Sequence, residues 1–305
     1  MAIAHRPSEI TLPAVNQGWD NLYQFLCWQF PRIDAAIWWQ RLQDGKVYWF
    51  GGEVVRHDTP FSPSRRLCYF REVSVEPQIP FQEEVVYQDE HILVACKPHF
   101  LPVTPGGDYI HECLLERLRQ RQQLADLVAV HRLDRETAGL VLFSKQPASR
   151  ADYYQLFASG QIHKSYLAVA WIADDIVARP GQQWQVHNRL EKAQPRFLMQ
   201  QVEGDANASS GIQLLARQGD LGLFQLTPYT GKTHQLRVHM LGLGMPLLHD
   251  KYYPTLQPKA ALDFSQPLQL LAAQLSFIDP LSGEQRQFCS HRRLAGWPVA
   301  DEATL

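Results

Sequence analysis

The sequence has few cysteines and no long apolar run. Its five cysteines are an odd number and none stands in a CxxC spacing. This pattern is typical of reduced thiols in a cytosolic protein and gives no zinc framework. No apolar stretch approaches the roughly 18 residues that would cross a membrane, and the N-terminal residues lack the apolar core of a secretion signal. We therefore expect a cytoplasmic protein without a membrane segment.

An excess of positive charge is also missing. Lys and Arg number 29 against 31 Asp and Glu, which gives a net charge of −2. This balance excludes a protein that binds nucleic acid through bulk positive charge. It leaves room for a basic cleft on a neutral body, because the field at a site depends on the charges nearby. The 305 residues, 45% of them hydrophobic, suffice for one large domain or two smaller ones.

Several common site motifs are absent. The chain has no GxxxxGK[ST] phosphate loop, no GxGxxG fingerprint, no HExxH, no GxSxG and no HxE with PCxxC. These absences exclude the corresponding nucleotide, metalloprotease, hydrolase and zinc-deaminase sites at the level of motifs. His234 and His239 are five residues apart, so they diverge on either a helix or a strand and make a poor metal pair. We expect no metal.

Prolines at positions 77 and 80 suggest a domain boundary after residue 76. The spacing of apolar residues predicts a helix over 21–30, and Asp34 is placed to cap a second helix through Leu42, with Gly45 just beyond its end. Short strands are expected next. The predicted strands of this first domain, residues 1–76, are 47–50, 53–56 and 67–73.

Strands outnumber helices in the second domain, residues 77–305, and do not alternate with them regularly. This order favours an α+β fold around a mixed, largely antiparallel sheet. A polar stretch over 203–211 is expected to be a surface loop. The predicted helices are 111–122, 148–159 and 233–243, and the predicted strands are 85–87, 92–95, 140–144, 166–172, 185–188, 211–217, 223–227 and 270–277.

A dense polar segment, HRLDRETAGL over 131–140, stands between apolar stretches. Charges in such a place must be paired or must face a cleft. Asp134 has an arginine on either side, and a neighbouring cation keeps a carboxylate ionised even when it is partly desolvated. An ionised, positioned carboxylate suits covalent catalysis at a sugar or an electrophilic ring carbon. The alternative is a structural salt-bridge turn.

A second polar segment, TGKTHQLRVHM over 230–240, follows a predicted strand. Thr233 is a plausible N-cap, which would place Arg237 one turn into a helix. Lys232, Arg237 and Lys251 against Asp250 leave a local excess of positive charge, so this region could form a phosphate-facing wall. An ordinary amphipathic helix is the alternative. Two shorter segments, Lys97-Pro98 and the strand that begins Lys164-Ser165-Tyr166, say little alone.

Together these four segments, in this order, resemble the motifs of the RluA family of RNA pseudouridine synthases. The segments are Lys97-Pro98, the HRLD motif at 131–140, the K-x-Y motif at 164–166 and the GKTHQLRVH motif at 231–239. The resemblance covers residues 85–288. Three positions depart from the family pattern: Ala138 replaces a serine, His99 stands where glycine is common, and His249 stands where a glycine precedes Asp250, so the local backbone there is expected to differ.

The resemblance implies an isomerase that converts uridine in RNA to pseudouridine without a cofactor or metal. It implies that Asp134 is the nucleophile, that Arg237 pairs with this aspartate and holds it ionised, and that Tyr166 stacks on a flipped base and helps to remove the C5 proton. Arg132 is expected to enter the space that the base leaves. The expected RNA-binding residues are Arg132, Lys164, Lys232, Lys97, His131 and His234.

The first domain loosely resembles the small ribosomal-protein-S-four-like RNA-binding domain, in which a helical pair precedes a few strands. Phe30-Pro31, Trp39, Gly45 and Val47 carry this resemblance. It implies that basic residues of the domain meet phosphates; the alternative is a solvated face on a small capping domain. The basic residues in question are Arg32, Arg41, Lys46, Arg65 and Arg66.

Two other functions compete with the synthase. One is a non-catalytic RNA-binding or chaperone protein on the same fold, which would not need Asp134, Tyr166 and Arg237 together. The other is a glycoside or nucleoside hydrolase that uses Asp134 and Glu136, but paired carboxylates of hydrolases usually come from different elements. The target is expected to be ribosomal or transfer RNA, with the modified position open, and the protein is expected to be a monomer.

Overall fold

The computed structural model describes residues 2–31, 33–258 and 263–297. The chain forms two compact units. The first comprises the chain up to Pro77 together with Gly106–His111, and the second comprises Gln78–Pro105 and the chain from Glu112 onward. The sequence suggested a single boundary after residue 76, with 106–111 in the second domain. Among the described residues, no helix is long and apolar enough to span a bilayer.

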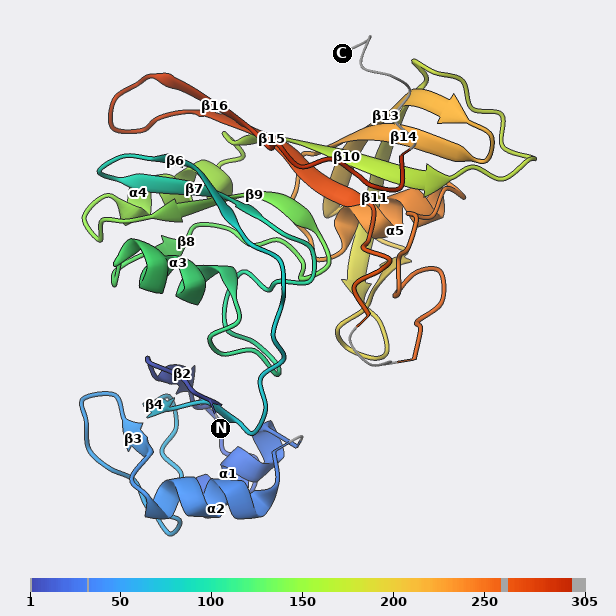
Figure 1. Ribbon diagram of the computed structural model, residues 1–305. Helices are drawn as coiled ribbons and strands as arrows, with labels where there is room; N and C mark the ends of the chain where they lie inside the picture. The colour runs from blue at the N-terminus through green and yellow to red at the C-terminus, as the bar shows by residue number, and fades with distance from the viewer. Residues whose placement is uncertain (1, 32, 259–262, 298–305) are drawn as a thin grey trace. The chain divides into compact units, whose positions relative to one another are not determined.

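The first unit joins a helical pair to two small sheets (Figure 1). Asn21 and Asp34 cap the two helices by accepting hydrogen bonds from the backbone N–H groups of Gln24 and Ala36. The core beneath them is rich in aromatic rings, including Trp38 and Trp49. The elements are β1 (Ala2–Ile3), β2 (Ser8–Thr11), α1 (Leu22–Gln29), α2 (Ala35–Gln43), β3 (Val47–Trp49), β4 (Arg66–Tyr69) and β5 (Glu72–Val73).

Four described basic residues of the first unit, all of them expected to meet phosphates, are paired with carboxylates. Arg41 is buried and bonds to Glu72, which also accepts a hydrogen bond from Lys46. Arg65 and Arg66 pair with acids on neighbouring strands or turns, Glu53 and Glu9 respectively. The expectation that Arg41 meets phosphate is wrong, because its side chain is buried against this partner. Arg32 lies outside the described residues.

The second unit is built on one large sheet (Figure 1). Its strand order is β12-β11-β13-β14-β10-β15-β9-β7-β6, with β16 paired to β15 and β8 paired to β9. All pairs are antiparallel except β15 with β9. The strands are β6 (Glu84–Gln88), β7 (Ile92–Lys97), β8 (Val128–Ala129), β9 (Ala138–Ser144), β10 (His163–Trp171), β11 (Gln183–Lys192), β12 (Met199–Val202), β13 (Ala208–Gln218), β14 (Leu221–Pro228), β15 (Leu270–Ile278) and β16 (Gln285–Cys289).

In the described part of this unit, three helices accompany the sheet: α3 (Leu114–Gln122), α4 (Arg150–Ala158) and α5 (Gln235–Gly242). Figure 1 shows α3 and α4 beside the half that contains β7 and β9, and α5 on the half that contains β13 and β14. The short parallel contact between β15 and β9 joins the two halves. Gly139 is required there, because its φ is +114° and a Cβ would clash with the backbone of Ala272.

The predicted α+β class with a largely antiparallel sheet is confirmed. Several local predictions are wrong. Residues 53–56 form only an isolated bridge, Tyr48 with Val54, and the predicted strand 67–73 divides into β4 and β5. The polar stretch 203–211 ends early because β13 begins at Ala208.

The helix predicted from residue 111 starts only at Leu114. Glu76 explains this delay, because its carboxylate accepts hydrogen bonds from the backbone N–H groups of Ile110 and His111 within the first unit. Those residues are therefore held outside the helix.

Candidate active site

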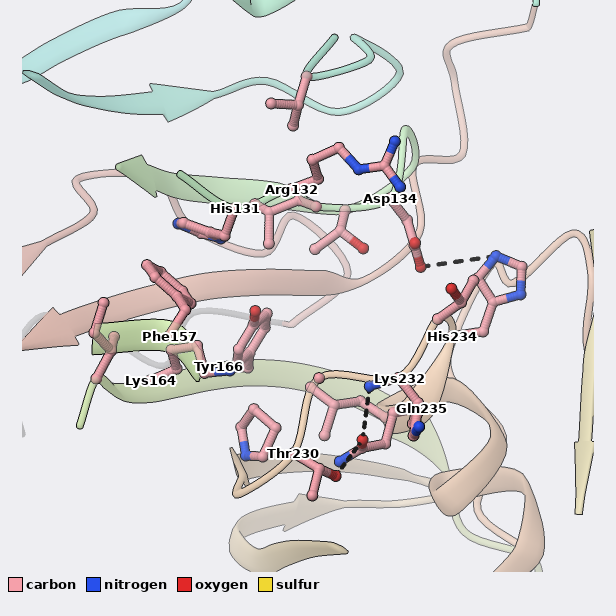
Figure 2. Close-up of a pocket in the computed structure, with 18 of the residues that line it drawn as sticks. His131, Arg132, Asp134, Phe157, Lys164, Tyr166, Thr230, Lys232, His234 and Gln235 are labelled. Atoms are coloured by element: carbon pink, nitrogen blue, oxygen red, sulfur yellow. Dashed lines mark hydrogen bonds and ion pairs between the residues drawn. The ribbon is translucent and has the colours of Figure 1, made fainter. Parts of the chain in front are cut away.

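A cavity of about 850 Å³ opens at the middle of the large sheet. Its walls come from segments that are distant in sequence: the HRLD segment before β9, the start of β10, the end of α4 with the turn that follows, and the loop between β14 and α5 (Figure 2). The strands β14, β10, β15 and β9 are consecutive neighbours in the sheet. The four polar segments of the sequence therefore converge at this point, although not all of their side chains face the cavity.

Asp134 lies in the turn between β8 and β9, with 28% of its side chain exposed. The turn is closed by a hydrogen bond from the backbone N–H of Thr137 to the Asp134 carbonyl, 3.1 Å long. Figure 2 shows the carboxylate facing the imidazole of His234 across the cavity, where Nε2 is 3.9 Å from Oδ2. The carboxylate is thus reachable from the cavity and fixed by its backbone.

Lys97 supports this turn from beneath. Its ammonium donates to the carbonyl oxygens of Pro98, Leu101 and Arg135 at 3.0, 2.7 and 3.0 Å. Burial lowers the pKa of Lys97 to about 7. Because the side chain is fully buried and its three donors are used, the expectation that Lys97 contacts RNA is wrong. It instead ties the Lys97-Pro98 segment to the residue after Asp134.

Two histidines also hold the turn that carries Asp134. His131 accepts a hydrogen bond at Nε2 from the backbone N–H of Leu142 and stacks on Phe157. Burial lowers its pKa to about 3, so the ring is neutral. His99 bonds through Nδ1 to the carbonyl oxygen of Glu136 at 2.7 Å, and burial lowers its pKa to about 4. His131 lines the cavity, but its ring is held by the Leu142 N–H and by Phe157. His99, which stands where glycine is common in the family, helps to hold the same turn.

Arg237 is 1% exposed and projects from α5 toward Asp134. Its strong partner is Asp250: Nε donates to Oδ2 at 2.8 Å and Nη2 donates to Oδ1 at 2.5 Å. Only Nη1 remains, 3.6 Å from Oδ2 of Asp134 and without a hydrogen-bond partner among the described residues. Burial opposes the charge of Arg237, but bonding to Asp250 raises its pKa above the ordinary value.

Asp250 is the site residue that the sequence analysis missed. The sequence placed it near Arg237 only as an opposing charge, and expected Arg237 to pair directly with Asp134. Its Oδ1 also accepts hydrogen bonds from the backbone N–H groups of Tyr252 and Tyr253, at 2.8 and 3.2 Å. Asp250 therefore fixes the guanidinium so that one N–H edge is left for Asp134. His249, just before it, has φ +62°, so the backbone keeps the left-handed conformation that glycine favours instead of differing.

His234, not Thr233, is the N-cap of α5, and its φ is +52°. This left-handed conformation delays the helix to Gln235 and turns the imidazole toward Asp134. Nδ1 lies 2.9 Å from the hydroxyl of Tyr253. Burial lowers the pKa of His234, with Arg237 acting in the same direction and Asp134 opposing it, so the ring is neutral at pH 7. His234 can therefore donate or accept a hydrogen bond without adding charge.

Tyr166 is almost fully buried on β10 and lines the cavity. The pairing of β10 with β15 shifts register between Ser165 and Tyr166, and such bulges re-aim side chains. Burial raises the pKa of Tyr166 and the nearby Asp134 raises it further, so the phenol stays protonated at neutral pH. The ring can stack, and the hydroxyl can donate a hydrogen bond.

The loop between β14 and α5 is organised by the buried Gln235. Its Oε1 accepts from the hydroxyl of Thr230 and the backbone N–H of Lys232, at 2.6 and 3.1 Å (Figure 2). Its amide nitrogen donates to Ser209 and Ser210 on β13. Gln235 thus fixes the wall of the cavity opposite Asp134.

Among the cations that line the cavity, Arg132 and Lys232 are exposed and Lys164 is half-buried. No carboxylate of the described residues lies within ion-pair distance of them. The predicted phosphate-facing wall needs correction, because Arg237 is buried and Lys251 lies outside the cavity lining. Among the described residues, no group of three or more His, Cys, Asp or Glu side chains could hold a metal ion.

Comparison with known proteins decides the family. Residues 91–241 match the family model of RNA pseudouridylate synthase. The dual-specificity RNA pseudouridine synthase RluA of Haemophilus influenzae is 31% identical over 71% of this chain and 96% of its own length. The chain belongs to the RluA family. The Vibrio cholerae RluA is 34% identical over 65% of this chain and 78% of its own length.

The fold of this RluA-family chain agrees with a solved structure. Human RNA Pseudouridylate Synthase Domain Containing 4 matches with a TM-score of 0.52 and 25% identity, over 68% of this chain and 87% of the human chain. The family is one of isomerases that convert uridine in RNA to pseudouridine. The family model covers the HRLD, K-x-Y and GKTHQLRVH motifs, and it ends before Asp250.

Proposed function

We propose that this RluA-family chain isomerises specific uridines in ribosomal or transfer RNA, with Asp134 as the nucleophile and the target base flipped out of its stack. One observation carries the proposal: Asp134 faces the cavity beside a buried cation, yet no hydrogen bond joins it to that cation. The carboxylate oxygens therefore stay available for nucleophilic attack.

The reaction balances without a co-reactant. The N1–C1′ bond breaks, the uracil turns, and a C5–C1′ bond forms. C5 loses a proton and N1 gains one, so no atom is gained or lost overall. Asp134 could attack C1′ of the sugar or the uracil ring, and both routes return the carboxylate at the end. Arg237 Nη1 supports the ionised carboxylate before attack and after its release.

A uridine within a duplex could not reach Asp134, whose turn lies inside a cavity of about 850 Å³. Flipping the nucleotide costs a few kcal/mol of unstacking. Tyr166 offers a ring on which the uracil can stack, worth about 1–3 kcal/mol, and Arg132 can fill the space that the base leaves. Because its phenol is protonated, Tyr166 is better suited to stacking on the base and donating a hydrogen bond than to accepting the C5 proton directly.

The cations at the cavity are proposed to contact RNA phosphates. Arg132, Lys164 and Lys232 have no carboxylate partner among the described residues, so an incoming phosphate would not need to displace one. His234 is proposed to act next to the reacting base, through its position 3.9 Å from Asp134. The first unit is proposed to add RNA affinity as an S-four-like domain, although its paired cations leave that contribution small.

The test is pseudouridine formation in unmodified transcripts. Purified protein and Asp134→Asn are incubated with ribosomal RNA and transfer RNA in separate reactions, since relatives bear the name dual-specificity. The RNA is then digested and its nucleosides are separated by chromatography. We expect pseudouridine in at least one RNA class, none with Asp134→Asn, and unchanged RNA binding by that variant. Equal activity of Asp134→Asn, or no pseudouridine in either class, would contradict the proposal.

A further inference from the structure

Tyr229 is a large aromatic side chain left open to solvent at the rim of the cavity. It directly follows β14, lines the cavity, and is 57% exposed. An exposed aromatic ring at the rim of a cavity offers a flat apolar face, with a polar hydroxyl at its edge, to whatever enters the cavity. The motifs quoted above assign it no role, since they begin two residues later, at Gly231.

The ring of Tyr229 packs against a glycine of the large sheet. It lies across Gly211 of β13: a Cβ on Gly211 would stand 2.8 Å from the Tyr229 hydroxyl oxygen and 3.5 Å from the carbon that bears it. Gly211 has no positive φ, so its backbone does not require glycine. The missing side chain instead provides space for the ring. An exposed ring resting on the sheet loses little entropy when a flat partner stacks on it.

The surroundings of the ring indicate the kind of partner. Lys232 lies three residues further along the same loop, and Arg132 faces the same cavity. Both are exposed, and no carboxylate of the described residues is paired with them. An aromatic ring among free cations is the arrangement by which proteins hold single-stranded nucleic acid, with bases stacked and phosphates neutralised.

We propose that Tyr229 is a stacking platform for the RNA base next to the target uridine. This inference rests on the proposed function, because it takes the flipped uridine to occupy the cavity beside Asp134. The flanking base leaves its own stack when the target nucleotide is extruded, and the ring at the rim receives it. Tyr229 thus binds substrate without touching the reacting atoms, and it contributes to the choice of sequence around the uridine.

The first experiment measures steady-state kinetics on a stem-loop cut from the RNA class that the wild-type protein modifies. Tyr229→Ala is compared with two controls. Tyr229→Phe keeps the ring. Trp171→Ala removes an exposed aromatic at the end of β10 that lies outside the cavity lining. Stacking on one base predicts a KM about tenfold higher for Tyr229→Ala, with kcat nearly unchanged. Tyr229→Phe and Trp171→Ala should behave as wild type.

The second experiment identifies the base by a double-mutant cycle. The flanking nucleotides of the stem-loop are replaced one at a time by abasic residues, and binding is measured in the Asp134→Asn background so that turnover does not intervene. If Tyr229 stacks on one base, the losses of binding free energy caused by removing the ring and by removing that base will not be additive. Additive losses at every flanking position would overturn the proposal.

The third experiment changes Gly211, against which the ring packs, and keeps Tyr229. Gly211→Ala should push the Tyr229 hydroxyl aside, which is inexpensive because that atom ends a flexible side chain. Gly211→Ala should lower RNA affinity when Tyr229 is present and should leave it unchanged in the Tyr229→Ala background. A wild-type KM for Tyr229→Ala, with wild-type protein active, would reject the platform alone; inactivity of the wild type on every RNA would reject the proposed function and the platform with it.

Discussion

Two buried arginines, one in each compact unit, are held in nearly the same way. Arg41 donates from Nε to Glu72 at 3.0 Å, and Arg237 donates from Nε to Asp250 at 2.8 Å. In both guanidinium groups, Nη1 is buried without a hydrogen-bond partner among the described residues. Arg41 lies over the ring of Trp38, whereas Arg237 directs Nη1 to within 3.6 Å of Asp134.

The difference shows that an arginine–carboxylate pair is not a function by itself. In the first unit the pair joins helix α2 to strand β5, and Nη1 of Arg41 is buried. In the second unit the same pair leaves one N–H edge beside a reachable carboxylate. We therefore expect the neighbour of that edge to decide whether the pair stabilises the fold or supports chemistry.

The test with the largest expected effect removes the charge of each carboxylate without changing the shape of its side chain. Asp250→Asn keeps an acceptor for the Tyr252 and Tyr253 N–H groups but loosens Arg237. We expect kcat to fall about 100-fold, as when one preorganised electrostatic group is lost, with KM little changed. Steady-state kinetics on the modified RNA measures both.

Glu72→Gln is the matched control in the first unit. It should lower the unfolding temperature and leave kcat of the folded protein unchanged, because Arg41 faces no reacting group. Asp250→Glu, which restores the charge, should recover part of the lost kcat. Equal loss of kcat in Glu72→Gln, or full activity of Asp250→Asn, would show that the two pairs do not differ as described.

A second prediction compares the free and the paired cations. Each of Arg132→Ala and Lys232→Ala should weaken RNA binding and reduce the slope of log K against log salt concentration by about one. Arg65→Ala and Arg66→Ala, whose side chains already pair with carboxylates, should change the slope less. Binding titrations over a salt series, in the Asp134→Asn background, give the slopes. Equal slopes for all four variants would remove the distinction.

The smallest expected effect is on pH stability. Burial alone would raise the pKa of Glu72, but hydrogen bonds from Lys46 and Arg41 lower it below its ordinary value of 4.5. The pair therefore contributes stability above that value, and the contribution is lost as pH falls through the lowered pKa. The first unit should unfold more readily near pH 3 than at pH 7, and this difference should shrink in Glu72→Gln.

Tryptophan fluorescence is the measurement for that prediction, because most tryptophans of the chain lie in the first unit. An unfolding temperature whose pH dependence is the same in wild type and Glu72→Gln would contradict it. The tryptophans of the first unit are Trp19, Trp28, Trp38, Trp39 and Trp49.

Much of the fold could be predicted, since local patterns determine it. Apolar periodicity located the main strands and helices of the second unit, and Asp34 caps its helix as predicted. Motif order brought Asp134, Tyr166 and Arg237 to one cavity. Their catalytic roles stay predictions.

What could not be predicted depends on contacts between distant residues. Nothing near Lys97 reveals that it lies beneath Arg135, 38 residues away. The sequence placed Asp250 near Arg237 only as an opposing charge, and it does not say that Asp250, not Asp134, accepts two hydrogen bonds from the guanidinium. The bulge that aims Tyr166 follows from the register of β10 with β15, which no local pattern encodes.

The most direct measurement is hydrogen release from C5. RNA that carries 5-tritiated uridine is incubated with the wild-type protein and with Asp134→Asn, and tritium in water is counted with time. The account predicts release by the wild type, in proportion to the pseudouridine formed, and none by Asp134→Asn. Release by Asp134→Asn at the wild-type rate, or pseudouridine formation without release, would contradict the assignment of the chemistry to this cavity.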